Sequence, residues 1–140
     1  MRWWDIDAAL AIEQELFPDA WSVETFWAEL ARVPETRHYL VADDAGAVVG
    51  YAGLMAVGRQ ADVQTVAVAP GQQGHGYGAT LLRAMLDEAT SRGCTEVLLE
   101  VRVDNEPALH LYEKAGFERI SVRRGYYPGG VDGLVMRLRI

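Results

Sequence analysis

Three glycines at alternate positions, Gly74, Gly76 and Gly78, follow an apolar segment and open an amphipathic one. Glycine allows a ligand to approach the backbone closely and adopts conformations that other residues avoid. The free N–H groups of such a loop, at the start of a helix, attract the negative charge of a phosphate group. Residues 66–82 (VAVAPGQQGHGYGATLL) therefore predict a phosphate-binding loop.

Two widespread phosphate loops fit this segment poorly. A P-loop requires a lysine after its last glycine, and none follows Gly78. The dinucleotide fingerprint matches at Gly74, Gly76 and Ala79, with Glu100 near the position of the ribose-binding acid. However, residues 69–73 separate the strand from the loop, and too few strands follow for a doubly wound fold. The dinucleotide interpretation is therefore the weaker one.

A second pattern lies downstream of the loop. Together with residues 73–78, residues 105–117 (NEPALHLYEKAGF) resemble the two signatures of the GNAT N-acetyltransferase superfamily, in matching order and spacing. Residues 17–22 (FPDAWS), 98–102 (LLEVR) and 123–128 (RRGYYP) resemble its RimI-type branch, the bacterial protein N-terminal alanine acetyltransferases. The resemblance implies one GNAT domain over residues 1–140. It also implies an α/β fold with a mixed, mostly antiparallel sheet, a parallel pair at the cofactor cleft and about four flanking helices.

The resemblance implies acetyl-CoA as co-substrate and no metal. Loop N–H groups would bind the pyrophosphate, and the backbone of Val66 and Val68 would pair with the pantetheine arm like an added strand. Many relatives carry arginines where Gly74 and His75 stand, so binding is expected to depend on backbone amides. The implied cofactor-binding residues are Val66, Ala67, Val68, Gln73, Gly74, His75, Gly76, Tyr77, Gly78, Ala79 and Asn105.

The chemistry of acetyl transfer requires a base for the amine and an acid for the departing thiolate. The resemblance assigns Glu100 as the base and Tyr112 as the acid. An N-terminal α-amine has a pKa of about 8, so a carboxylate can deprotonate it, directly or through water. Asn105 and Tyr112 lie seven residues apart in one predicted helix, which places them on one face, about 10 Å apart. The alternatives are a core tyrosine at Tyr112, a glutamate paired with Arg102 or solvent at Glu100, and a helix cap at Asn105.

By resemblance, Trp21, Tyr126 and Tyr127 would form the walls of the peptide-binding groove. The alternative is that these aromatic side chains only pack in the core or in a lid. His75 is expected at the surface of the loop. Cys94 precedes a strand and is expected to be buried and inert.

Apolar periodicity and turn residues predict the elements that position these groups. A first helix at 6–17 would direct Glu13 and Glu15 outward, and a second, capped by Ser22, would bury Phe26, Trp27 and Leu30. A run of strand, helix, strand, helix and strand in the second half predicts parallel neighbours. The expected strands are 38–42, 48–57, 62–68, 96–103, 118–122 and 134–140, and a Gly-rich loop separates the last two. Helices are expected at 78–92 and 106–115. Residues 97, 99, 101 and 103 are expected on one face of their strand.

Net charge and cysteine content limit the kinds of partner and the cellular location to be expected. The net charge of −7 argues against nucleic-acid binding and favours a basic partner. One cysteine excludes an internal disulfide and fits a reducing, cytoplasmic location. No segment predicts a secretory signal or a membrane span. The resemblance implies the N-terminal peptide of a protein, such as a ribosomal protein, as the partner, bound by a monomer or weak dimer.

These observations predict an enzyme that acetylates a protein N-terminal α-amine by direct attack in a ternary complex. The resemblance points to the N-terminal alanine of small-subunit ribosomal protein eighteen. Two alternatives stay open. The first is an acetyltransferase for a lysine side chain, a small-molecule amine or another protein N-terminus, and the second is a non-catalytic acyl-CoA-binding regulatory subunit.

Overall fold

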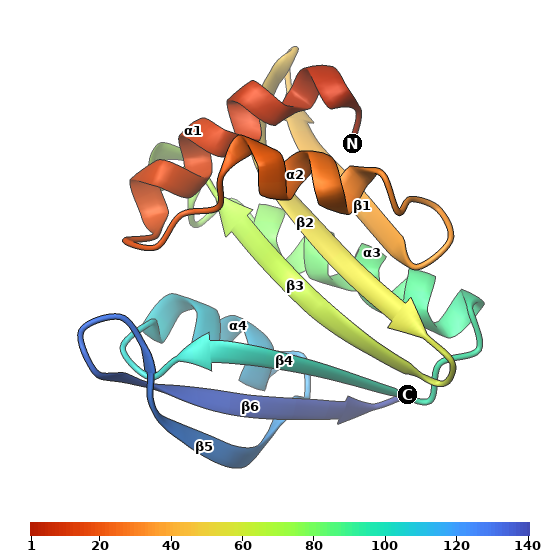
Figure 1. Cartoon of the computed structure of the whole chain (residues 1–140), viewed down its shortest axis with the longest axis vertical. Helices are drawn as coiled ribbons and strands as arrows, with labels where there is room; N and C mark the ends of the chain where they lie inside the picture. Colours follow the sequence, from red (N-terminus) through yellow and green to blue (C-terminus); the bar gives the residue numbers. More distant parts are fainter.

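A central sheet carries helices on both faces in the computed structural model, which describes residues 1–140 (Figure 1). None of the helices combines the length and apolar character needed to cross a membrane. The strands are β1 (Arg37–Asp44), β2 (Ala47–Val57), β3 (Gln60–Val68), β4 (Glu96–Arg102), β5 (Glu118–Tyr127) and β6 (Val131–Arg139). The helices are α1 (Ile6–Leu16), α2 (Val23–Leu30), α3 (Tyr77–Ser91) and α4 (Glu106–Lys114), with short 3-10 turns η1 (Trp3–Asp5) and η2 (Pro70–Gln72).

The six strands are arranged in the order β1-β2-β3-β4-β6-β5, and all neighbours are antiparallel except β3 and β4. This confirms the predicted mixed sheet with one parallel pair. The expectation of further parallel neighbours in the second half is wrong, because β6 inserts between β4 and β5 and pairs antiparallel with both. β5 and β6 form a hairpin, and β6 turns back along β4 as well as β5. The local pattern of helices and strands does not reveal such a long-range pairing.

Apolar stripes on the helices determine the two layers of the core. The predicted stripe of α3 is buried against the sheet, with Leu82 and Met85 at its centre, and joins a cluster of 18 buried residues that α4 also contacts. Burial of each large aliphatic side chain contributes about 1.5–3 kcal/mol. On the opposite face, α1 covers β2 and β3, and α2 covers β1 and β2, through a smaller cluster around Phe26 and Tyr51. The sheet is therefore enclosed on both faces over β2 and β3 (Figure 1).

The prediction that Glu13 points outward is wrong. Glu13 is only 3% exposed and follows Ile12 on the buried side of α1. The Tyr51 hydroxyl donates a hydrogen bond to its carboxylate, and the backbone N–H of Trp21 donates another at 3.0 Å. Burial raises the pKa of Glu13, and these two donors oppose that effect. The buried carboxylate thus ties α1 to β2 and to the loop that follows the helix.

Three smaller expectations are also corrected. Trp27 is half exposed and stacks on Trp3, with ring centroids 6.5 Å apart, instead of facing the core. Val103 lies beyond the end of β4 and is exposed. The predicted Gly-rich loop is mostly strand, because β5 continues to Tyr127 and β6 begins at Val131.

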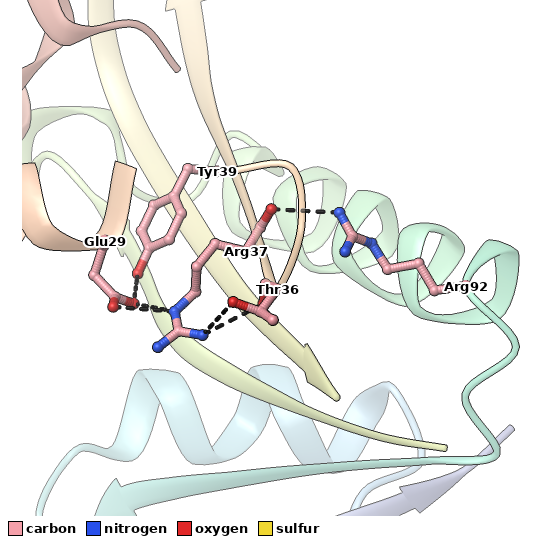
Figure 2. A network of polar contacts seen from close by, with 5 residues as sticks. All are labelled: Glu29, Thr36, Arg37, Tyr39 and Arg92. Atoms are coloured by element: carbon pink, nitrogen blue, oxygen red, sulfur yellow. Dashed lines mark hydrogen bonds and ion pairs between the residues drawn. The ribbon is translucent and has the colours of Figure 1, made fainter. Parts of the chain in front are cut away.

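A polar network fastens α2 to β1 (Figure 2). The carboxylate of Glu29 accepts hydrogen bonds from Arg37 Nε, at 2.9 and 3.0 Å, and from the Tyr39 hydroxyl at 2.6 Å. Arg92, after the end of α3, donates to the carbonyl of Arg37 at 3.3 Å. Glu29 thus fixes α2 to β1, as Glu13 fixes α1 to β2. The loop between α1 and α2 therefore begins and ends at helices that are fixed to the sheet.

Candidate active site

The parallel pairing of β3 and β4 is short and creates a gap in the sheet. It runs only from Gln60 opposite Glu96 to Val63 opposite Leu99. The next residue, Gln64, is skipped in the β2–β3 register, which marks a β-bulge at the same level. A bulge bends its strand, so β3 and β4 diverge beyond this point. The two strands are drawn splaying apart in Figure 1.

A cleft of about 830 Å³ occupies the region beyond the divergence. It is lined by the end of β3, the glycine loop and one side of α4. The predicted cofactor-binding residues that line it are Val66, Ala67, Val68, Gln73, Gly74, Gly76, Tyr77, Gly78, Ala79 and Asn105. His75 is the one predicted member that does not line the cleft.

The glycine loop opens α3 with an exposed set of amides. Gly76 is the N-cap, with φ of +83°, and no side chain caps the helix. A Cβ added at Gly74 or Gly76 would meet no atom within 4 Å, so both glycines border open space. An uncapped helix N-terminus leaves its first N–H groups without partners and attracts an anion. These features fit the pyrophosphate of a cofactor such as acetyl-CoA.

The edge of β3 that faces the gap carries backbone groups without strand partners. Ala69 donates to Val49 of β2 at 2.8 Å, and donors alternate along a strand. The backbone groups of Val66 and Val68 therefore face the gap, where an extended ligand could pair with them. One of these groups is already occupied, because the Gln73 side chain donates to the carbonyl of Val68 at 3.3 Å.

A second, smaller cavity of about 150 Å³ adjoins the cleft. The two share six lining residues, so they meet at one place. Glu100, Trp21 and Tyr127 line the smaller cavity only, on the side of the α1–α2 loop. The shared residues are Phe17, Val66, Arg102, Asn105, Ala108 and Tyr112.

Glu100 lies on the open face of β4 and is accessible. The side chains of Val97, Leu99 and Val101 are buried on the other face, as the alternation predicts. Arg123 Nη2 lies 3.2 Å from Glu100 Oε1, whereas the predicted alternative partner, Arg102, pairs with Asp104 at 3.0 Å. A hydrogen bond to Glu100 and the charge of this carboxylate raise the pKa of Tyr126. The carboxylate is thus surrounded by groups from β5 at the mouth of the small cavity.

Tyr112 reaches the junction of the two cavities from α4. Its side chain is buried and its ring packs on Phe117, with centroids 5.9 Å apart. Burial, and after it the neighbouring Tyr127, raises the pKa of the Tyr112 hydroxyl. Burial likewise raises the pKa of Tyr127 to about 12. Both phenols therefore keep their protons at neutral pH, so Tyr112 is a potential proton donor and also a member of the core.

Asn105 combines the two roles considered for it. Its Oδ1 accepts a hydrogen bond from the N–H of Ala108 at 3.3 Å and caps α4. It also lines both cavities. The seven-residue spacing to Tyr112 thus places both side chains along the same cavity wall.

The three residues predicted to form the walls of the peptide-binding groove fall into two groups. Trp21 and Tyr127 line the small cavity, and Trp21 also packs on Phe26, with ring centroids 5.3 Å apart. Tyr126 is half exposed and lines neither cavity, although its ring contacts that of Tyr127. Wall and packing roles therefore coexist at Trp21.

Sequence reasoning missed several lining residues. His110 and Lys114 of α4 border the cleft, and Asp19 borders the small cavity. The first two follow Pro107 at three and seven residues, so helical spacing could have identified that face. Asp19 lies in residues 17–22 (FPDAWS), a segment that the resemblance marks, although it does not single out this residue.

Comparison with known proteins identifies the family of this chain. Residues 6–117 match the sequence model of the acetyltransferase (GNAT) family. The chain is 42% identical to the N-alpha-acetyltransferase RimI of Mycobacterium tuberculosis, over 95% of this chain and 85% of that protein. It is 35% identical to the ribosomal protein bS18-alanine N-acetyltransferase of Escherichia coli, over 97% and 92%. The crystal structure of the S18-alanine enzyme from the same organism superposes with a TM-score of 0.89 at 34% identity, covering 100% of this chain and 90% of that one.

The family match covers most of the chain, and the relatives match along nearly all of it. The diverging β3 and β4, the glycine loop at α3 and the order of the strands agree with that assignment. The chain belongs to the GNAT acetyltransferase family.

Proposed function

We propose that this chain transfers the acetyl group of acetyl-CoA to the N-terminal alanine of ribosomal protein bS18. One observation carries the proposal: Glu100 and Tyr112, from different elements, line the same small cavity, and Tyr112 stands where this cavity joins the cofactor-sized cleft. The names of the relatives from Mycobacterium tuberculosis and Escherichia coli support an α-amine acceptor and its identity. The proposal includes a single GNAT domain over residues 1–140 that acts in the cytoplasm as a monomer or weak dimer.

In this proposal the glycine loop and the start of α3 hold the pyrophosphate of acetyl-CoA. The backbone of Val66 and the free N–H of Val68 pair with the pantetheine arm. Asn105 and Ala108 form the opposite wall. The thioester then lies at the junction of the two cavities, where Tyr112 stands. Acetyl-CoA supplies the activated acyl group, and the residues position it.

Glu100 accepts a proton from the α-ammonium group of the acceptor, directly or through water. The freed nitrogen lone pair forms the C–N bond to the acetyl carbon, and the C–S bond breaks. The nitrogen then releases its second proton to solvent, which leaves a neutral amide. Tyr112 donates its phenolic proton to the departing sulfur and is later reprotonated from solvent. Orientation of both reactants in one site contributes to the rate, as does each proton transfer.

The test is mass spectrometry of protein N-termini in cells with and without this chain. The proposal expects bS18 to lose its N-terminal acetyl group when the chain is absent. Purified protein should also acetylate a peptide with a free N-terminal alanine and should ignore the same peptide with a blocked N-terminus and an internal lysine. Acetylation of the lysine peptide alone would favour the side-chain alternative. Tight acetyl-CoA binding without turnover on any amine would favour the regulatory subunit.

A further inference from the structure

Arg102 carries the only buried side-chain nitrogen or oxygen that lacks a hydrogen-bond partner, its Nη1. The rest of the guanidinium is fixed. Nε donates to one oxygen of Asp104 at 3.0 Å, and Nη2 donates to the other at 3.1 Å. Because a two-point pair sets the orientation of the whole planar group, the direction of Nη1 is also set. An unpaired buried donor on a charged group is unfavourable, so it calls for an explanation.

The position of Arg102 suggests what satisfies this donor. Arg102 ends β4 two residues after Glu100, and the intervening Val101 is buried on the other face. Residues two apart on a strand project from the same face, about 6.7 Å apart. Arg102 also lines both cavities at their junction. The donor therefore stands beside the proposed base, at the junction of the two cavities.

The groups around the guanidinium leave Nη1 available. The ring of Tyr127 lies against it, with Arg102 Cζ 5.5 Å from the ring centroid. Asp19 adds a negative charge nearby. Neither residue hydrogen-bonds to Nη1, and none of the protein's other side chains does so.

The α-amine of a peptide is followed, one carbon further, by a carbonyl oxygen, whereas the amine of a lysine side chain is not. We infer that Arg102 determines acceptor specificity by donating from Nη1 to the carbonyl oxygen of the acceptor's first residue. This inference rests on the proposed function. Arg102 thereby selects peptide α-amines over other amines, because an amine without that carbonyl leaves a buried donor unpaired.

Nη1 is shielded from solvent in the ligand-free protein, so the acceptor must displace part of its cover. Tyr127 is the neighbour suited to move. The β5–β6 register is interrupted between Arg123 and Tyr127, so the ladder holds this segment less regularly than the rest of the hairpin. Entry of the acceptor then exchanges the contact with Tyr127 for a hydrogen bond to the carbonyl oxygen.

The experiment compares two small acceptors, alanine N-methylamide and sec-butylamine, of which only the first carries an amide carbonyl next to the amine-bearing carbon. A neutral pentapeptide that begins with alanine is tested beside them. Arg102→Met should lower kcat/KM for the pentapeptide and for alanine N-methylamide about 10- to 100-fold. It should leave sec-butylamine turnover and the KM for acetyl-CoA unchanged. Arg102→Lys keeps the charge but not the fork and should also lose the preference. Arg119→Met removes an exposed arginine that pairs with Glu113, away from both cavities, and is the control.

A rise in the KM for acetyl-CoA with an unchanged acceptor KM would overturn the inference, since Nη1 would then serve the cofactor. An equal loss for sec-butylamine would overturn it as well. Calorimetric titration of CoA-saturated protein with alanine N-methylamide tests binding without turnover, and thermal melting of each variant reports folding. If the wild-type chain acetylates no N-terminal peptide, the proposed function fails. The titration still decides whether Arg102 recognises the carbonyl group.

Discussion

Arg123 Nη2 lies 3.2 Å from Oε1 of Glu100, so in the ligand-free protein a cation from β5 occupies the carboxylate that is proposed to take the proton of the amine. Both side chains remain partly open to solvent, with exposed fractions of 53% for Arg123 and 30% for Glu100. Ion pairs of this kind contribute about 0–1 kcal/mol. An incoming amine can therefore replace Arg123 at small cost.

The ion pair between Glu100 and Arg123 allows the role of the base to be tested separately from that of its neighbour. Glu100→Gln should lower kcat about 10²- to 10⁴-fold and leave acetyl-CoA affinity unchanged, because the amide cannot accept the proton. Arg123→Met, the matched change at the other end of the ion pair, should alter kcat/KM by less than about 5-fold. Steady-state kinetics with an N-terminal alanine peptide measure both. Comparable losses in the two variants would indicate that the pair, and not the carboxylate alone, performs the reaction.

Tyr112→Phe should reduce kcat by about 10²-fold or more while the protein stays folded. Burial and Tyr127 account for the raised pKa of Tyr112, and no hydrogen-bond partner is among the causes. Loss of the hydroxyl should therefore lower the unfolding free energy by less than about 1 kcal/mol. Kinetics and urea denaturation of the same preparation check the two halves. An unchanged kcat would return Tyr112 to a packing role.

The pH profile follows from the same environment. Because the pKa of Tyr112 is raised above its ordinary value of 10, the acid stays protonated throughout the range in which an α-amine, with a pKa of about 8, loses its proton. We expect kcat/KM to rise through pH 8 and to stay level up to pH 10. Measurement in constant-ionic-strength buffers tests this. A decline between pH 8 and 10 that persists in Tyr127→Phe and disappears in Tyr112→Phe would contradict a raised pKa of Tyr112.

The glycine loop allows a controlled test of close backbone approach. Gly76→Ala places a methyl group in the open space at the start of α3 and should weaken acetyl-CoA binding at least about 10-fold. Gly58→Ala meets equally open space at a similar positive φ of +63°, in the distant turn between β2 and β3. Its backbone strain is comparable, so it should lose stability but not affinity. Equal affinities by calorimetry for the two variants would contradict a phosphate-binding role of the loop.

Burial of Glu13 predicts a pH-dependent stability. Its folded-state pKa is raised above the ordinary value of 4.5, so its contribution is fully present below pH 4.5 and is lost as pH rises through the folded pKa. The unfolding free energy of the wild type relative to Glu13→Gln should therefore be greater at pH 4 than at pH 8. Glu15→Gln, at an exposed position of the same helix, should show no such trend. Urea denaturation at the two pH values measures the difference.

Local patterns were sufficient for the elements that carry the site. Leu82 and Met85 follow helical spacing, and Val97, Leu99 and Val101 alternate, so α3 and β4 were predicted close to their observed bounds. Glu13 was misplaced because its partner, Tyr51, is 38 residues away, and polarity alone suggested an exposed position. The location of β5 at the edge depends on β6, which follows it in the chain. Contacts between residues far apart in the chain thus determine the burial of Glu13 and the edge position of β5, which local sequence patterns could not predict.

The same distinction holds within the site. The resemblance named Glu100 and Tyr112, and the structure brings both to one cavity. Arg102 was considered only as a partner for Glu100, since adjacent charges on one strand face suggest a pair. Asp104 takes that place because the turn after β4 returns its carboxylate to the guanidinium. Small changes of backbone direction at a strand end decide such a contact, and the residue types alone do not.

Only four residue pairs, from Gln60–Glu96 to Val63–Leu99, join the β1–β3 half of the sheet to the β4–β6–β5 half. Beyond them the two halves are linked through side chains and helices. A ligand that pairs with the free edge of β3 extends this narrow seam, so its binding energy also opposes separation of the halves. Saturation with such a ligand should therefore slow hydrogen exchange along the whole seam. The ligand thus helps to hold the two halves of the sheet together, so the mechanical continuity of the sheet is a property of the complex and not of the chain alone.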